Sequence, residues 1–247
     1  MITSIAFVSV FFYVMFGSHL SFLEQQLQYE RVRTAFEEKQ AVVVEMLHKN
    51  QLKTNNLNLL LVAFKAEQQL VIYAKSSSDK AFKPLVNYNI CRSSGKLGPK
   101  RREGDLQVPE GFYHIDRFNP VSDYHLSLGI NYPNASDSLK EMLGNLGGDI
   151  FIHGACVTIG CLPMTDDLMK EIYPYAVHAK NSGQATIPVY IFPFDMTDAT
   201  YQSYRKTYEN DPDLLRFWAN LKQGYDQFTQ SGQALNYSVA PNGDYAF

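Results

Sequence analysis

Two side chains with complementary chemistry lie close together in the segment FIHGACVTIGCLPM, residues 151–164. His153 and Cys161 are eight positions apart, a separation that one turning loop can close. A thiol with an ordinary pKa of about 8.5 is mostly protonated at neutral pH, so a nucleophilic cysteine needs a neighbouring base such as imidazole. Gly160 permits a tight turn that exposes the sulfur and directs backbone N–H groups at an oxyanion. The pair alone also fits an inert buried cysteine, so the wider pattern has to decide.

The pattern HGACVTIGC resembles the signature of the L,D-transpeptidase catalytic-domain family, in which His-Gly is followed by Ser or Thr, one residue, and then Gly-Cys. The resemblance spans residues 30–240 in order, and it is greatest to the branch of murein L,D-transpeptidases and meso-diaminopimelate amidases. The other segments that carry it are CRSSGKLGPK (91–100), GDLQVPEGFY (104–113), FNP (118–120), YHLSLGINYPN (124–134) and GGDIFIHG (147–154). It implies cysteine-dependent acyl transfer on peptidoglycan stem peptides.

The resemblance also implies a role for each residue of the motif. Cys161 is the nucleophile that forms a thioester acyl-enzyme, His153 is the general base, and the carbonyl of Gly154 orients the imidazole. The backbone N–H groups of Gly160 and Cys161 form the oxyanion hole. Thr158 supports the loop through its hydroxyl and is counted with the substrate-binding residues.

The chain departs from the family pattern at two positions. Ile159 stands where many members carry His, and Pro163 stands where many carry an Arg. An Arg there binds a substrate carboxylate through two hydrogen bonds, which a proline side chain cannot do. We therefore expect Lys100 and Arg101, in the basic stretch 96–102, to bind the donor instead, although such a stretch is also typical of a solvated turn.

The group that attacks the thioester decides the reaction. An acceptor amine competes with water only when its stem peptide is bound and oriented, so the missing Arg favours hydrolysis of a diaminopimelate-linked amide. The alternatives are transpeptidation that crosslinks peptides or attaches a protein, a non-catalytic muropeptide-binding envelope protein, and a cytoplasmic cysteine hydrolase. The expected partners are peptidoglycan stem peptides, with a peptidoglycan-linked lipoprotein as a further candidate.

The three cysteines leave their redox state open. They lack the spacing of a structural zinc site, and we expect no metal and no cofactor. In an oxidising compartment Cys91 and Cys156 can form one bridge that leaves Cys161 free, and the alternative is two reduced, buried cysteines. His114 and His125 are interpreted as packed or surface residues rather than ligands.

The first seventeen residues, MITSIAFVSVFFYVMFG, are uncharged and strongly apolar. Their length lies at the lower limit for a membrane span and above a typical signal core, so residues 1–18 are predicted to be an export signal or a membrane anchor. A mis-assigned start or a buried helix is the remaining interpretation. Signal and anchor both place the body outside the cytoplasm, in the periplasm or cell envelope, and an anchor would attach it to the inner membrane.

Hydrophobic periodicity predicts an α+β, β-rich fold with mixed sheets and flanking helices, preceded by an N-terminal helix. Residues 19–55 form a helical segment that covers one side of the domain, and residues 56–247 form a catalytic domain of the L,D-transpeptidase type. Strands are expected at 59–63, 70–74, 85–91, 112–115, 124–130, 149–152, 188–194 and 237–239, and helices at 165–180 and 211–230. The Gly- and Pro-rich residues 93–111 predict an ordered loop pair or a flexible lid.

Composition limits the classes of partner. With 45% hydrophobic and 13% aromatic residues the chain can bury a core, and it is not a disordered chain. A formal net charge of -3 provides no domain-wide basic field, which argues against nucleic acid as a partner.

Overall fold

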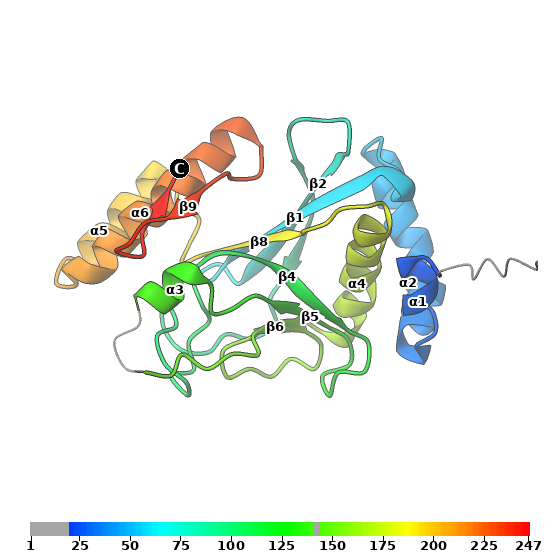
Figure 1. The fold of residues 1–247 in the computed structure, drawn as a ribbon, viewed down its shortest axis with the longest axis horizontal. Coiled ribbons are helices and arrows are strands. Elements are labelled where there is room, and N and C mark those ends of the chain that lie inside the picture. The colour runs from blue at the N-terminus through cyan, green and yellow to red at the C-terminus, as the bar shows by residue number, and fades with distance from the viewer. Residues whose placement is uncertain (1–19, 141–143) are drawn as a thin grey trace, which may run out of the picture.

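The computed structural model describes residues 20–140 and 144–247, and its centre is a mixed eight-stranded sheet with helices on both faces (Figure 1). The strand order is β3-β2-β1-β8-β4-β5-β6-β7, and a separate small sheet pairs β9 with β10. The strands are β1 (Leu57–Phe64), β2 (Gln69–Ser76), β3 (Lys83–Asn89), β4 (Gly111–Asn119), β5 (Ser127–Ile130), β6 (Phe151–His153), β7 (Leu162–Pro163), β8 (Pro188–Phe192), β9 (Ser238–Val239) and β10 (Tyr245–Ala246). The helices are α1 (Phe22–Gln26), α2 (Glu30–Lys49), the 3-10 turn η1 (Thr54–Asn56), α3 (Ala135–Leu139), α4 (Asp166–Asn181), α5 (Asp198–Thr207) and α6 (Pro212–Ser231). The expected α+β class with a mixed sheet and flanking helices is confirmed.

Strand β1 shows how the sheet packs on both sides. Leu59 and Leu61 belong to a core shared with α2 and α4, whereas Leu60 and Val62 belong to a second core shared with α5 and α6. Successive strand side chains point to opposite faces, so a strand covered on both faces is apolar at nearly every position. The helices α1, α2 and α4 lie on one side of the sheet, and α5 and α6 lie on the other (Figure 1).

The N-terminal helices pack directly on α4. Ser21 and Glu24 form a reciprocal capping box that begins α1. Tyr173 of α4 donates a buried hydrogen bond to Gln26, and Lys39 of α2 pairs with Asp167 at 2.7 Å. The helices α1 and α2 therefore cover one side of the sheet through α4.

A buried ion pair fixes the Gly- and Pro-rich segment to the sheet. The side chains of Lys65 and Glu110 are 3% and 0% exposed, and their charged atoms are 2.8 Å apart. Lys65 also donates to the carbonyls of Gly98 and Val108, while Glu110 accepts hydrogen bonds from Gly98 N–H and from the Trp218 indole. The segment is thus the ordered loop rather than a flexible lid, because its buried polar groups are satisfied by one another.

Several elements differ from their expected form. The strand expected at 124–130 begins only at Ser127, because His125 adopts a left-handed conformation with φ 68°. The elements α3, α5, β7 and β10 had not been expected.

The predicted signal or anchor at residues 1–18 lies outside the described residues. Among residues 20–140 and 144–247, no helix is both long and apolar enough to cross a membrane.

Candidate active site

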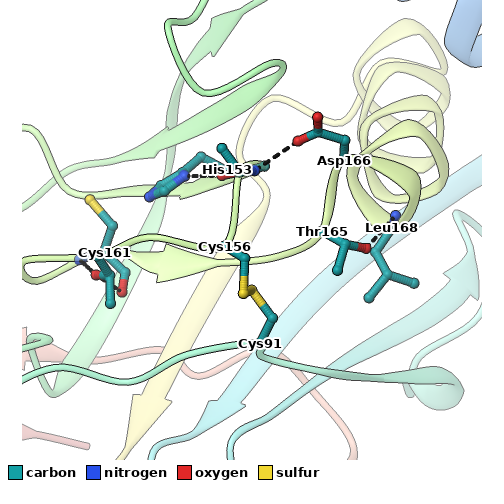
Figure 2. The surroundings of a disulfide bond; sticks show 10 residues. Cys91, His153, Cys156, Cys161, Thr165, Asp166 and Leu168 are labelled. Atoms are coloured by element: carbon teal, nitrogen blue, oxygen red, sulfur yellow. Dashed lines mark hydrogen bonds between the residues drawn. A yellow bond between two sulfur atoms is a disulfide. The ribbon is translucent and has the colours of Figure 1, made fainter.

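The parallel pairing of β6 and β7 brings His153 and Cys161 together. His153 ends β6, Cys161 immediately precedes β7, and the register places His153 opposite Pro163. Both side chains line one cavity of about 570 Å³, and Figure 2 shows Cys161 and His153 on neighbouring segments beside the disulfide. The loop of residues 154–161 therefore closes the eight-residue separation, as the sequence predicted.

His153 is held in one tautomer. Its ring is buried, and Nδ1 lies 2.5 Å from the carbonyl oxygen of Gly154. A carbonyl can only accept, so Nδ1 carries the proton and Nε2 keeps a free lone pair. The ring also packs against Tyr124 at 4.7 Å between centroids. Burial lowers the pKa of His153 below its ordinary 6.5, which keeps the imidazole neutral and able to accept a proton.

Cys161 is a free thiol, since it takes no part in the disulfide. Burial raises its pKa above the ordinary 9.0, and Sγ lies 3.7 Å from the carbonyl oxygen of Asp149. A neutral imidazole beside a neutral thiol is an arrangement for general-base catalysis, in which the proton leaves sulfur as the sulfur attacks.

Thr158 organises the turn before the nucleophile. Its hydroxyl oxygen accepts hydrogen bonds from Gly160 N–H at 3.1 Å and Cys161 N–H at 2.8 Å, and it donates to the Cys161 carbonyl. The two N–H groups expected to form an oxyanion hole thus point at the Thr158 hydroxyl in this structure. Gly160 has φ 140°, a conformation that side chains rarely adopt, and it lies against the backbone of Gln107.

The other end of the loop is fixed by backbone contacts. Gly154 N–H donates to the carbonyl of Tyr124 at 3.0 Å, and Ala155 N–H donates to the Asp166 carboxylate at 2.7 Å (Figure 2). Ala155 and Cys156 both have positive φ, at 67° and 34°. Such conformations cost about 1–3 kcal/mol each for non-glycine residues and persist only where surrounding contacts over-determine them.

A disulfide between Cys91 and Cys156 links the Gly- and Pro-rich segment to the catalytic loop (Figure 2). Of the two alternatives left open by the sequence, the structure shows the bridge that leaves Cys161 free. Cys91 N–H also donates to the carbonyl of Pro163 at 3.0 Å. The catalytic loop and strand β7 are therefore both joined to residue 91.

The structure does not bring the expected donor-binding cations to this cavity. Lys100 is buried and pairs with Asp105 at 2.7 Å. Arg101 pairs with the buried Asp137 at 2.9 Å, and its guanidinium lies 5.1 Å from the Phe217 ring. Both charges are neutralised within the fold, so neither is retained as a substrate ligand.

Sequence reasoning missed Arg92, Tyr124 and Asp166. Arg92 lines the cavity, Tyr124 packs on the base, and Asp166 holds the loop. The position of Arg92 next to Cys91 was the one available signal, and it had meaning only once the cysteine pairing was known. Among residues 20–140 and 144–247, no group of three or more His, Cys, Asp or Glu side chains is arranged to hold a metal ion.

Comparisons with known proteins agree with the motif. The YkuD family, described as the L,D-transpeptidase catalytic domain, matches residues 58–191. The Escherichia coli protein named "Putative L,D-transpeptidase YafK", from strain K12, is 41% identical over 184 residues, which cover 74% of this chain and 70% of that protein. The O157:H7 protein of the same name gives the same values.

Two solved structures share low similarity with the chain. The helical cell shape determining protein Pgp2 from Campylobacter jejuni aligns with a TM-score of 0.45 and 18% identity, over 74% of this chain and 73% of that one. Bdellovibrio bacteriovorus Bd1075 aligns with a TM-score of 0.41 and 17% identity, over 65% and 57%. Because the family match spans more than half of the sequence and the relative is 41% identical, the chain belongs to the L,D-transpeptidase catalytic-domain family.

Proposed function

We propose that the protein cleaves a peptidoglycan stem peptide by acyl transfer to Cys161, and that water releases the acyl group. The observation that supports this best is the juxtaposition of a free thiol with a neutral histidine whose Nδ1–H is committed to Gly154. This arrangement leaves Nε2 as the base, with a backbone carbonyl in the orienting role that a carboxylate takes in other triads.

The proposed reaction has two steps. In the first, Cys161 Sγ attacks the carbonyl carbon of the scissile amide while His153 Nε2 accepts the thiol proton. His153 then gives that proton to the departing amine, the C–N bond breaks, and a thioester remains. In the second step His153 removes a proton from water and the water oxygen attacks the thioester carbon. The C–S bond breaks, His153 returns the proton to sulfur, and the products are the free thiol and a carboxylic acid that ionises to a carboxylate.

The oxyanion of each tetrahedral intermediate would be stabilised by the N–H groups of Gly160 and Cys161. Both now donate to Thr158, so we propose that they exchange the hydroxyl oxygen for the oxyanion during reaction. The exchange costs little hydrogen bonding, since the oxyanion is the stronger acceptor. Thr158 is then a positioning residue and not a substrate ligand.

We propose water as the acceptor, and so an amidase or peptidase acting at diaminopimelate. Pro163 offers no cation two residues after the nucleophile, and its carbonyl is already bonded to Cys91. A cavity with one Lys or Arg among its described lining residues supports binding of one stem peptide, the donor, better than simultaneous binding of a donor and an acceptor. Crosslinking of peptides, or attachment of a lipoprotein, is the alternative outcome of the same thioester.

The Cys91–Cys156 disulfide supports a location outside the cytoplasm, because structural disulfides persist in oxidising compartments. We propose the periplasm or cell envelope, reached through the apolar N-terminal segment as a signal or an inner-membrane anchor. A peptidoglycan-linked lipoprotein is a candidate leaving group there.

The decisive experiment is incubation with purified muropeptides without reductant, followed by mass spectrometry. Released fragments that have gained one water support hydrolysis, and crosslinked dimers support transpeptidation. Cys161→Ser and His153→Gln should abolish both products with the fold retained, while His48→Gln, an exposed histidine on α2, should change nothing. Binding without any product in the unsubstituted protein would instead support a non-catalytic muropeptide-binding protein.

A further inference from the structure

The cavity that holds Cys161 contains an arginine that the proposed reaction does not use. Arg92 lines this cavity and is its only Lys or Arg among the described lining residues. Its side chain is exposed, and within residues 20–140 and 144–247 it forms no ion pair or hydrogen bond. Asp123 and Asp149 line the same cavity, but Arg92 pairs with neither, and Asp149 pairs instead with Arg117 at 3.1 Å. The guanidinium therefore keeps its donors available for a ligand.

The backbone beside Arg92 is attached to both sides of the nucleophile. Cys91 is bridged to Cys156, which precedes Cys161 on the catalytic loop, and Cys91 N–H is bonded to Pro163, which follows it. Pro163 occupies the position at which an arginine would carry the donor-binding charge. Its carbonyl holds the neighbouring segment, which brings a different arginine to the cavity.

We propose that Arg92 is a specificity-determining residue that binds a carboxylate of the acyl donor, and that the Cys91–Cys156 disulfide holds it in place. The proposal rests on the proposed function. A planar guanidinium with free donors matches a carboxylate through two parallel hydrogen bonds. A stem peptide offers two such groups, the free carboxylate of diaminopimelate and the α-carboxylate of γ-linked glutamate, and both have the same recognition chemistry.

Steady-state kinetics on purified muropeptides tests the assignment. Arg92→Ala should raise KM by roughly 10- to 100-fold, the effect of losing a charged hydrogen-bond pair, with a smaller change in kcat. The KM of Arg92→Lys should fall between those of the unsubstituted protein and of Arg92→Ala. Arg102→Ala is the matched control, because Arg102 is an exposed arginine of the same segment that lies outside the cavity lining.

Amidated substrates identify the carboxylate. If Arg92 binds the diaminopimelate carboxylate, amidating that group raises KM for the unsubstituted protein and leaves Arg92→Ala unaffected. If Arg92 binds the glutamate carboxylate, amidating the glutamate instead raises KM for the unsubstituted protein and leaves Arg92→Ala unaffected. An Arg92→Ala protein with unchanged KM for every substrate would overturn the proposal.

Alkylation of Cys161 gives a second readout that needs no turnover, since it is the one free thiol of three cysteines. Iodoacetate carries a carboxylate and iodoacetamide does not. The rate of alkylation by iodoacetate divided by the rate by iodoacetamide therefore reports a cation in the cavity. We expect Arg92→Ala to lower this ratio severalfold and Arg102→Ala to leave it unchanged. Cys91→Ala/Cys156→Ala should lower it as Arg92→Ala does, and an unchanged ratio in that variant would refute the role of the disulfide.

The two readouts separate failure of the proposal from failure of the proposed function. Absence of Cys161-dependent turnover on any muropeptide, with an alkylation ratio that depends on Arg92, would refute the reaction and support carboxylate binding by Arg92. If turnover depends on Cys161 but the alkylation ratio and KM are the same in Arg92→Ala as in the unsubstituted protein, the reaction is supported and the role of Arg92 is refuted. A melting temperature of Arg92→Ala close to that of the unsubstituted protein is expected, because the side chain is exposed.

Discussion

Gly154 is the residue at which a single added methyl group should damage the site most directly. A Cβ at this position would lie 2.4 Å from Asp166 Oδ1, 3.0 Å from the Tyr124 carbonyl oxygen and 3.1 Å from His125 Cβ. Asp166 cannot simply swing away, because its carboxylate holds Ala155 N–H at 2.7 Å. Overpacking costs typically about 1–3 kcal/mol, and weakening of the Ala155–Asp166 hydrogen bond as the carboxylate shifts adds about 1 kcal/mol. We therefore expect Gly154→Ala to lower the free energy of unfolding by about 2–4 kcal/mol.

Urea denaturation checks this value. With a slope of about 2 kcal/mol per molar, the midpoint should fall by about 1–2 M. Turnover should fall as well, since the carbonyl that orients His153 belongs to the displaced residue. Gly148→Ala is the matched control, because a Cβ there meets nothing within 4 Å, and its free energy of unfolding should stay within about 0.5 kcal/mol of the original. A Gly154→Ala protein with an unchanged midpoint and full activity would refute the derived packing of the loop.

Four further predictions concern the catalytic loop and its immediate neighbours. Burial lowers the pKa of His153 in the folded protein, so kcat/KM should fall on the acid side only below pH 6.5, where the imidazole becomes protonated and cannot accept a proton. A fall that begins above pH 7 would contradict the burial argument. Since burial raises the pKa of Cys161 above 9.0, its alkylation by iodoacetamide should still be increasing at pH 9, whereas a plateau below pH 8 would indicate a preformed thiolate. Thr158→Val removes the acceptor of two N–H groups, so it should reduce kcat and lower the free energy of unfolding by about 1–2 kcal/mol. Thr158→Ser keeps the hydroxyl and should retain both values. Equal turnover and equal melting of the two variants would argue against a positioning role for the hydroxyl. Cys91→Ala/Cys156→Ala opens a bridge that spans 65 residues and should cost roughly 4 kcal/mol, measurable as a lower urea midpoint without reductant.

The sequence predicted the pairing of His153 with Cys161 because that pairing is local. The residues are joined by one short loop, and the apolar segment before His153 indicates a strand that ends there. The hairpin of β1 and β2 was predictable for the same reason, since its alternation is strong on both sides of a short turn. The short strand β7 carries no such pattern, and only its parallel pairing with β6 defines it.

Lys100 and Arg101 show what local reasoning cannot supply. Their charges suggested substrate binding, but Arg101 is neutralised by Asp137, which is 36 positions away on a helix that periodicity did not reveal. The bridge between Cys91 and Cys156 likewise joins residues 65 positions apart. A cation is available to a ligand only if no distant residue pairs with it. Such pairs are set by the packed fold and cannot be read from the spacing of residues in the sequence.

The segment that begins at Cys91 is attached at its start by a covalent bond and farther along by the Lys65–Glu110 pair under α6. A segment held at two points cannot swing over the cavity and back in each catalytic cycle, so binding and release need not wait for a closing motion. This part of the cavity rim therefore keeps one position. If the proposed function holds, the peptide would enter and leave a site whose edge at Cys91 keeps one shape throughout the cycle.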